Sequence, residues 1–381
     1  MNVTAFQVDS LSSLDARIMD TIKTSFTPSL AIIFSTVTHG FCELSQLLGR
    51  YDIGLIGGST AGEFTNGEIT EGNMAVMLLD IDKEQYHLHF ADATALTSKQ
   101  SGKNIARFGL YHFSRPAYIT LMTFAVNGDD MIEGIYEASA QEPTIFGGTC
   151  SDATLALSTK VFVGDKISEN AVATLVVDSD KIEVNGLAVS GWEPVGTQHV
   201  ITKAKGNIIY TINGEPALDY CQQFFGSHYD LKEEKDTISL SNAQYPFQLE
   251  REGNRTMRAP VGSNLKERSL IMAGSVRDGD VFHFSMASGF DMVDRNLERF
   301  AHFKSRTSNA DALLMFSCKA RHLSLGPAIR DEIRGVYELW EKPCTGLFTY
   351  AEISKHANGK TNYSNETCSL VTLGTIKSAN E

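Results

Sequence analysis

The stretch from Leu55 to Phe64, LIGGSTAGEF, is the first place where this sequence could perform chemistry. Apolar residues run there into a Gly-Gly pair, two hydroxyl residues and a Gly-Glu pair. A phosphate-binding loop ends in Gly-Lys-Ser/Thr, because its lysine must reach the phosphates. Here Glu63 follows Gly62, and a carboxylate at that place would repel phosphate. The stretch therefore argues against a nucleotide site.

The same stretch comes close to a nucleophile elbow, in which a serine sits on a turn that enters a helix. Ser59 has suitable neighbours, but the Asn-Gly pair at 66–67 predicts a turn instead of a helix. Two interpretations stay open. Ser59 and Thr60 could satisfy the backbone of a tight glycine turn, or this turn could face a ligand, because paired glycines allow close approach.

Two glutamates and an arginine form the second candidate group. Glu63 and Glu352 occupy similar places in two related turns, and both could line one cavity if the turns face each other. A carboxylate there could receive a ligand ammonium or hold Arg321 by a bidentate bond; local capping and a general acid–base pair are alternatives. Arg321, in SCKARHLSLGP, is expected in a loop before a helix that begins near Pro327. That position suits either an anion site at a helix N-terminus or a structural Arg–Glu pair.

Cysteine and histidine offer weaker signals. The six cysteines form no CxxC pair, so free and mostly buried thiols are expected. Cys150, on a glycine turn, is the candidate for a perturbed thiol, whereas Cys318 follows an apolar strand and should be packed. His87 and His89 alternate in QYHLHF, so both should point to one face of a strand near the surface.

Composition limits the function classes. The 381 residues carry a net charge of −13, with 42% hydrophobic and 21% charged residues. Nucleic acids and anionic membranes favour basic surfaces, so neither is an expected partner. The N-terminus lacks a basic segment followed by an apolar core, and the longest apolar runs are too short to span a bilayer. A cytoplasmic protein without membrane insertion is therefore expected.

The elements that would position these residues form a weak internal repetition. Three times, an apolar β-branched segment is followed by an amphipathic helix and a second apolar segment. The three copies are expected at 29–37, 38–50 and 51–60; at 117–126, 127–140 and 143–152; and at 311–318, 325–340 and 344–353. A further strand should follow each copy, at 73–82, at 160–165 with 171–180, and at 367–374.

The turns at the ends of these copies have matching chemistry. Gly57 to Thr60 resembles Gly147 to Cys150, and the third turn repeats a Thr and a Glu at 349 and 352. Ligands of open α/β sheets lie beyond the carboxyl ends of strands, so these turns are the predicted ligand site. The predicted ligand-facing residues are Gly57, Gly58, Ser59, Thr60, Glu63, Gly148, Thr149, Cys150, Arg321, Thr349 and Glu352.

The middle of the chain has a different pattern. Residues 182–192 and 197–214 alternate like antiparallel strands with Asn-Gly and Gly-Asn turns, and 215–226 reads as a short helix that Gly226 closes. A strand is expected at 276–288 and a helix at 290–306, and the polar stretch GSHYDLKEEKDT marks a candidate domain boundary. The fold class is α/β to α+β, with mixed sheets and two domains.

Several blocks resemble the FIST family, with its paired N-terminal and C-terminal domains. The blocks are IGGSTAGEF, FGGTCSD, GWEPVGTQHVITKAKGNIIYTINGEPALDYCQQFFG, SCKARHLSLG and GLFTYAEISKHANGKTNYSNETCSLVTL. The resemblance covers roughly residues 28 to 360 and implies a FIST N-terminal domain at 28–226 and a FIST C-terminal domain at 227–381. In one departure, Ala351 stands where the family usually has Gly, so a turn that needs positive φ there must differ.

The resemblance implies a sensory module that binds a small ligand and is not an enzyme. Stand-alone members resemble nitric-oxide-sensing proteins that bind haem b non-covalently and regulate a partner histidine kinase. Non-covalent haem needs an axial side chain, for which His322 and His112 are the candidates. An amino-acid sensor without haem is the alternative, followed by a hydrolase that uses Ser59 or Cys150 and by a purely structural interaction module. Ligand identity, partner and oligomeric state stay open.

Overall fold

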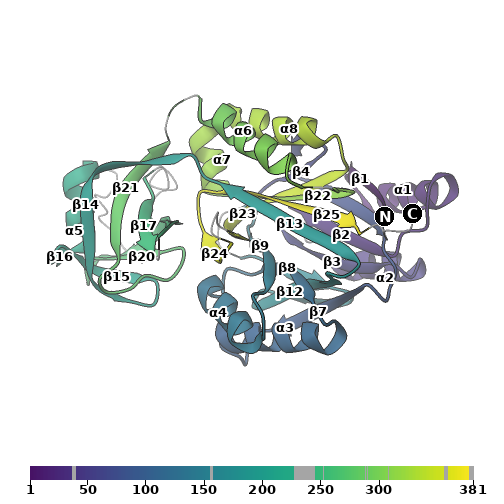
Figure 1. Cartoon of the computed structure of the whole chain (residues 1–381), viewed down its shortest axis with the longest axis horizontal. Helices are drawn as coiled ribbons and strands as arrows, with labels where there is room; N and C mark the ends of the chain where they lie inside the picture. Colours follow the sequence, from purple (N-terminus) through teal and green to yellow (C-terminus); the bar gives the residue numbers. More distant parts are fainter. Residues whose placement is uncertain are drawn as a thin grey trace.

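The chain folds into three copies of one strand–helix unit and a separate lobe, as the computed structural model shows (Figure 1). The structure describes residues 1–36, 40–154, 158–226, 245–251, 253–287, 289, 291–307, 309–355 and 359–376. The first repeat contains β1 (Asn2–Val8), α1 (Leu11–Thr24), β2 (Leu30–Ser35), α2 (Phe41–Arg50), β3 (Gly54–Ser59), the hairpin of β4 (Glu63–Thr65) and β5 (Glu68–Thr70), and β6 (Met74–Asp80).

The second repeat has the same element order, and the third has the same main strands and helices with an added helix α7 and a single strand, β24, in place of the hairpin. The second contains β7 (Tyr86–Asp92), α3 (Ser98–His112), β8 (Pro116–Met122), α4 (Gly128–Ala138), β9 (Thr144–Cys150), the hairpin of β10 (Val161–Val163) and β11 (Lys166–Ser168), and β12 (Ala171–Asp178). The third contains β13 (Ile182–Val189), α6 (Met292–Lys304), β22 (Ala312–Cys318), α7 (Lys319–Leu325), the 3-10 turn Gly326–Ala328, α8 (Ile329–Trp340), β23 (Cys344–Lys355), β24 (Thr361–Ser364) and β25 (Cys368–Thr375).

Strand pairing supports the repetition more strongly than the sequence does. In each repeat the second and third main strands are parallel, as in β2–β3, β8–β9 and β22–β23. The last strand lies antiparallel between the first and second, which gives the orders β1-β6-β2-β3, β7-β12-β8-β9 and β13-β25-β22-β23. The predicted mixed sheets and strand–helix–strand copies are therefore confirmed. Repeats two and three join edge to edge through β9 and β23 into an 11-stranded sheet.

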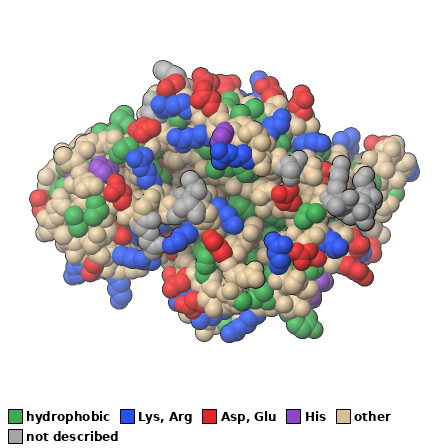
Figure 2. Space-filling model, in the orientation of Figure 1, with side chains coloured by type: hydrophobic (Ala, Val, Ile, Leu, Met, Phe, Trp, Pro, Cys, Tyr) green, Lys and Arg blue, Asp and Glu red, His purple; other side chains and the backbone are tan. Residues whose placement is uncertain are grey.

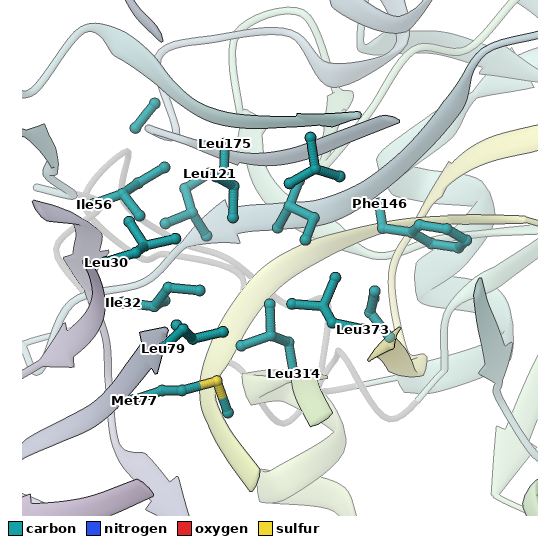
Figure 3. Close-up of a cluster of buried hydrophobic side chains, with 14 of the residues drawn as sticks. Leu30, Ile32, Ile56, Met77, Leu79, Leu121, Phe146, Leu175, Leu314 and Leu373 are labelled. Carbon is teal, nitrogen blue, oxygen red and sulfur yellow. The ribbon is translucent and has the colours of Figure 1, made fainter. Parts of the chain in front are cut away.

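The two large sheets pack face to face over the main core. Figure 3 shows this contact: Leu30, Ile32 and Met77 come from the six-stranded sheet, whereas Leu121 and Leu314 come from the 11-stranded sheet. Helices α1 and α2 pack on the outer face of the first sheet. Helices α3 and α4 cover the second repeat, and α6 and α8 cover the third. Apolar runs such as β2 are buried along their whole length because both faces of the sheet are covered.

A lobe is inserted between β13 and α6 of the third repeat (Figure 1). It is built from β14 (Trp192–Lys205), β15 (Ile208–Ile212), β16 (Glu215–Pro216), α5 (Ala217–Phe225), β17 (Phe247–Arg251), β18 (Asn254–Arg258), β19 (Pro260–Asn264), β20 (Ser269–Met272) and β21 (Val281–Ala287). Its antiparallel strands confirm the pattern predicted for the middle of the chain. Gly226 ends α5 with φ of 53°, as its place in the sequence predicts.

The predicted division at residue 226 runs through the lobe. Strands β14–β16 precede it and strands β17–β21 follow it, yet all of them belong to one sheet. The 11-stranded sheet also contains strands from both sides, such as β9 and β23. The division into 28–226 and 227–381 stays a prediction about sequence units, and most of the polar boundary stretch GSHYDLKEEKDT lies outside the described residues.

One glycine recurs at the same place in all three repeats. Gly57, Gly147 and Gly346 lie directly beside Ile33, Thr120 and Met315 of the parallel neighbour strand. A Cβ atom would come within 1.9, 1.8 and 2.5 Å of the carbonyl oxygens of these neighbours, respectively. These glycines therefore allow the close strand approach that brings the following turns together.

One local expectation was wrong, and the departure at Ala351 has a structural explanation. Arg321 lies within helix α7 rather than in a loop, because the chain turns into a helix directly after β22. Ala351 lies within β23 and is not among the described non-glycine residues with positive φ. The strand accommodates the alanine through an irregular register against β9, between Thr349 and Ala351.

Candidate functional site

The predicted turns do meet in the structure, but they fill the space between them. The Ser59 hydroxyl donates to the carbonyl oxygen of Ser151 at 2.8 Å, and the Thr60 hydroxyl donates to that of Phe348 at 3.0 Å. The Ser151 hydroxyl also donates to Phe348, at 2.5 Å. All three hydroxyl residues are buried. Residues from three repeats thus satisfy one another's backbone groups, which is the tight-turn interpretation of Ser59 and Thr60.

The second turn is equally closed. A Cβ atom on Gly58 would lie 2.3 Å from the sulfur of Cys150, and one on Gly148 would lie 2.7 Å from the carbonyl oxygen of Ala351. Cys150 is fully buried, and burial raises the pKa of its thiol. A protonated, enclosed thiol is a poor nucleophile. Activation of a cysteine requires a lowered thiol pKa, whereas the pKa of Cys150 is raised.

Glu63 is bound within its own repeat. Its Oε1 accepts hydrogen bonds from the backbone N–H of Asn73 at 2.8 Å and from the hydroxyl of Thr70 at 3.0 Å. Its Oε2 is buried and has no hydrogen-bond partner among the described residues. Burial raises the pKa of Glu63 to about 7, against the opposing effect of these donors.

Glu352 is bound in the same way in the third repeat. Thr349 donates its hydroxyl to Oε1 at 2.5 Å, and Thr367 donates its hydroxyl to Oε2 at 2.6 Å. Burial raises the pKa of Glu352 to about 8. Glu63 pairs with Leu347 of β23, five residues before Glu352, which puts their backbones about 16 Å apart along the strand. The two carboxyl groups therefore do not share one cavity.

Arg321 forms a buried ion pair. Its Nε donates to Glu332 at 2.9 Å and its Nη2 donates to the other carboxylate oxygen, so the bond is bidentate. Nη1 donates to the carbonyl oxygen of Ser190, and the guanidinium lies 5.2 Å from the ring centroid of Trp192. Arg321 and Glu332 are both fully buried. The structural Arg–Glu pair is therefore the interpretation that the geometry fits.

A fourth buried glutamate, Glu366, lies beside this pair. Glu366 has a positive φ of 54°, which is unusual for a residue other than glycine. Both of its carboxylate oxygens are buried without a hydrogen-bond partner among the described residues. Burial and the neighbouring Glu352 raise the pKa of Glu366 well above its usual range. Nothing in the sequence pattern singles out Glu366, because the signal is its backbone angle and burial.

The balance of buried charges, together with burial, favours raised pKa values at Glu352 and Glu366. Glu332, Glu352 and Glu366 share a dry region with a single guanidinium, that of Arg321. Complete ionisation would leave two negative charges unpaired, which a low-dielectric interior opposes strongly. Glu332 receives the guanidinium, and burial raises the pKa of both Glu352 and Glu366. The buried thiols of Cys318 and Cys368 also have raised pKa values, chiefly through burial.

The two candidate axial histidines lie in packed surroundings. His322 stacks on Phe348 with ring centroids 4.3 Å apart, and its Nδ1 is 3.2 Å from the Nζ of Lys319. Burial, with a smaller effect of Lys319, lowers the pKa of His322 to about 4. His112 lies 3.7 Å from His87, ring to ring. Neither histidine is among the residues that line the clefts described here.

A cleft between the lobe and the second repeat is the better candidate site. It measures ≈220 Å³ and lies at the carboxyl end of β8. Its core side is formed by residues 124–128 and Tyr363, and its lobe side by Asn207 and residues 272–274. The Tyr363 hydroxyl lies 2.8 Å from that of Thr149, so one predicted turn supports the cleft from below. Apolar walls with a few amide and hydroxyl groups are typical of small-molecule sites.

A buried arginine lies under the lobe side of this cleft. Arg258 donates to Asp129 at 2.7 Å, to the carbonyl oxygen of Ser275 at 3.2 Å and to that of Tyr363 at 2.5 Å. Gly274 covers it, since a Cβ atom there would lie 2.7 Å from the Nε of Arg258. Sequence patterns do not reveal this pair, because Asp129 and Arg258 are 129 positions apart and only the fold joins them.

The fold consists of repeated α+β units with an inserted antiparallel lobe, and the cleft lies where the lobe meets the second repeat. The family model of the FIST N domain matches residues 29–215, and that of the FIST C domain matches residues 217–355. The chain therefore belongs to the FIST family, whose domains are associated with sensing small ligands in signal transduction rather than with catalysis. No curated protein matches the chain.

Proposed function

We propose that this protein senses a small, largely uncharged ligand that binds in the cleft between the lobe and the second repeat. The observation that supports this most is that the cleft joins two separately folded parts of the chain. A ligand held between them binds one relative orientation better than others, so it shifts the population toward that orientation. A signalling partner then responds to the ligand-bound form, and we propose that this partner is a histidine kinase.

The lining of the cleft narrows the ligand class. Phe124, Val126, Met272 and Tyr363 offer apolar and aromatic surface, and Asn127 and Asn207 offer amides. The described lining residues carry no formal charge, and Arg258 below them is neutralised by Asp129. This environment favours a small neutral metabolite, or a zwitterion with an apolar side chain such as a hydrophobic amino acid.

The haem and nitric-oxide hypothesis has less support from the geometry. Pockets for drug-sized ligands have roughly 300–1,000 Å³, so a porphyrin would need a larger opening than this cleft. Haem iron can also accept methionine or tyrosine, and Met272 and Tyr363 do line the cleft. The Tyr363 hydroxyl, however, is engaged by Thr149. Haem b therefore ranks behind a metabolite as the proposed ligand.

A hydrolase has the least support. The Ser59 hydroxyl exchanges hydrogen bonds with two backbone groups, the carbonyl oxygen of Ser151 and the N–H of Lys160, both at 2.8 Å. A nucleophilic serine needs a general base within hydrogen-bond reach. A fluorophosphonate or iodoacetamide probe is therefore expected to label neither Ser59 nor Cys150 selectively.

Ligand screening of the purified full chain tests the proposal. Amino acids and small neutral metabolites are scanned by thermal shift, and any hit is titrated by calorimetry; haemin is titrated in parallel by absorption. The expected result is a saturable thermal shift with a metabolite and no sharp Soret band. A sharp band that shifts when nitric oxide meets the ferrous form would restore the haem hypothesis.

A blocking variant with a matched control places the binding. Ala125 lies in the cleft and is exposed, so Ala125→Trp should fill the cleft without disturbing the core. Ala140 is also exposed, beyond the other end of α4, and Ala140→Trp serves as the control. Loss of binding in the first variant alone is expected. Equal binding by both variants would move the ligand to another site.

A further inference from the structure

The chain crosses between core and lobe twice, and both crossings lie side by side. It enters the lobe through residues 190–192 and returns between Ala287 and Met292. Trp192 pairs with Ala287 in the β14–β21 ladder and packs in one buried cluster with Met292. Figure 1 shows the ends of β13 and β21 on the side of α6 and α7, with α4 on the opposite edge of the junction. Two adjacent crossings make a hinge.

Gly191 is the pivot of the entering strand. Its φ is 88°, in the region that favours glycine. A Cβ atom there would lie 2.3 Å from the Cγ of Met292 and 3.2 Å from the Nδ2 of Asn296, so helix α6 packs directly on this residue. Arg321 contacts the residues on both sides of Gly191, which are Ser190 and Trp192.

Arg321 holds both sides of this pivot at once. Its guanidinium donates to the carbonyl oxygen of Ser190 and lies over the ring of Trp192, 5.2 Å from its centroid. Glu332 fixes the same guanidinium bidentately from α8, and the Nδ2 of Asn296 on α6 donates to that carboxylate at 3.0 Å. The hinge is therefore connected to three helices of the core through one side chain.

We propose that Arg321 is the positioning residue of this hinge: it sets the lobe in the orientation that forms the cleft, and it does not bind the ligand. This role rests on the proposed function only in that the cleft is the site being shaped. Asp129 closes the opposite edge, where it accepts from Arg258 at 2.7 Å and from the N–H of Ser275 at 2.8 Å. Rotation about the hinge would separate these groups and open the cleft.

Distance measurements between spin labels test the proposal without any ligand. Labels at Lys205→Cys in the lobe and Glu133→Cys on α4 use exposed positions, and Cys42→Ser removes the exposed native cysteine. Arg321→Lys keeps the charge but loses the bidentate fork. The expected result is a broader distance distribution with a longer mean. A second label pair within the core, at Glu133 and Glu338, should not change.

Arg330→Lys, on the exposed side of α8, is the matched control and should leave both label pairs unchanged. If Arg321→Lys does not fold, Trp192→Phe weakens the cation–π contact in a packed position and is expected to broaden the distribution less. A folded variant whose lobe-to-core distribution stays as narrow as that of the parent chain would overturn the proposal. If Arg321→Lys broadens the distribution but the ligand screen of the parent chain finds no metabolite, the proposed function is rejected and the hinge role of Arg321 is retained.

Discussion

Glu63 in the first repeat and Glu352 in the third occupy similar backbone positions, but their surroundings differ. Glu63 accepts two hydrogen bonds near the β4–β5 hairpin and leaves one oxygen unpartnered among the described residues. Glu352 receives donors on both oxygens, from Thr349 and Thr367, yet has the higher pKa, about 8 against about 7. Deeper burial outweighs the better hydrogen bonding at Glu352.

The backbone of the turn is repeated in the two copies, whereas the surroundings of the glutamate are not. The recurring glycine and the strand order reproduce the turn in each copy. The surroundings diverge because the third repeat carries the lobe between β13 and α6, and its hinge brings Arg321 and Glu332 beside the turn. A hydrogen-bonded turn in the first repeat therefore corresponds to a charged junction in the third.

The largest expected effect comes from breaking the ion pair that only the third repeat has. Arg321→Leu should lower the free energy of unfolding by about 3–5 kcal/mol, because it leaves the carboxylate of Glu332 buried and unpaired. The double variant Arg321→Leu with Glu332→Leu should recover much of that loss, which chemical denaturation would reveal. A double variant less stable than the single one would contradict the assigned ion pair.

The next effect tests the part of the turn that the repeats share. Gly57→Ala and Gly346→Ala should each cost about 1–3 kcal/mol, since the added methyl meets a neighbouring carbonyl oxygen. Gly49, near the end of α2, has open space around its Cβ position, so Gly49→Ala should stabilise by about 0.5–1 kcal/mol. If unfolding curves show equal effects at all three positions, the close strand approach is not what requires glycine.

A smaller effect separates the two glutamates by pH. Both have folded pKa values above the ordinary 4.5, so their protonated forms stabilise the native state below pH 4.5. That stability is lost as pH rises, through about 7 for Glu63 and about 8 for Glu352, by about 1.4 kcal/mol per pH unit at most for each group. Glu352→Gln should flatten the decline up to pH 8, and Glu63→Gln only up to pH 7. Urea unfolding at pH 5–9 checks this, and identical slopes would remove the distinction.

The smallest expected effect lies where the two repeats touch at the surface. Arg334 on α8 is 3.3 Å from Glu68 in the β4–β5 hairpin, and both side chains are exposed. Arg334→Ala should change the free energy of unfolding by less than about 1 kcal/mol, because solvent and salt screen such a pair. A loss comparable to that of Arg321→Leu would mean that the contact between repeats is mainly electrostatic.

Local patterns predicted much of the secondary structure. The helix predicted at 127–140 begins at Asn127, whose side chain accepts a hydrogen bond from the N–H of Asp130 at 3.1 Å, and the Asn-Gly turn at 66–67 is confirmed by its positive φ angles. These features depend on neighbours in sequence, so periodicity and turn chemistry reveal them. Helix α7 was missed because SCKARHLSLGP has no clear apolar period.

The candidate site was harder to predict because its members come from distant segments. Tyr363 and Thr149 are 214 positions apart, and the cleft adds Asn207 and Met272 from the lobe. The sequence indicated that the glycine turns belong together, which the hydrogen bonds between Ser59, Ser151 and Phe348 bear out. It could not indicate that these turns would fill the space between them. The cleft therefore lies elsewhere, between the lobe and the second repeat.

The sequence by itself determined the repeated strand–helix units, the antiparallel middle segment and the FIST membership, since each follows from short-range pattern or from matched blocks. The tertiary structure alone decided that Arg321 pairs with Glu332, that burial raises the pKa of Glu352 and Glu366, and that a cleft opens under the lobe. Ionisation and cavities depend on burial and on which distant groups come within a few ångströms, and only the packed chain sets those distances.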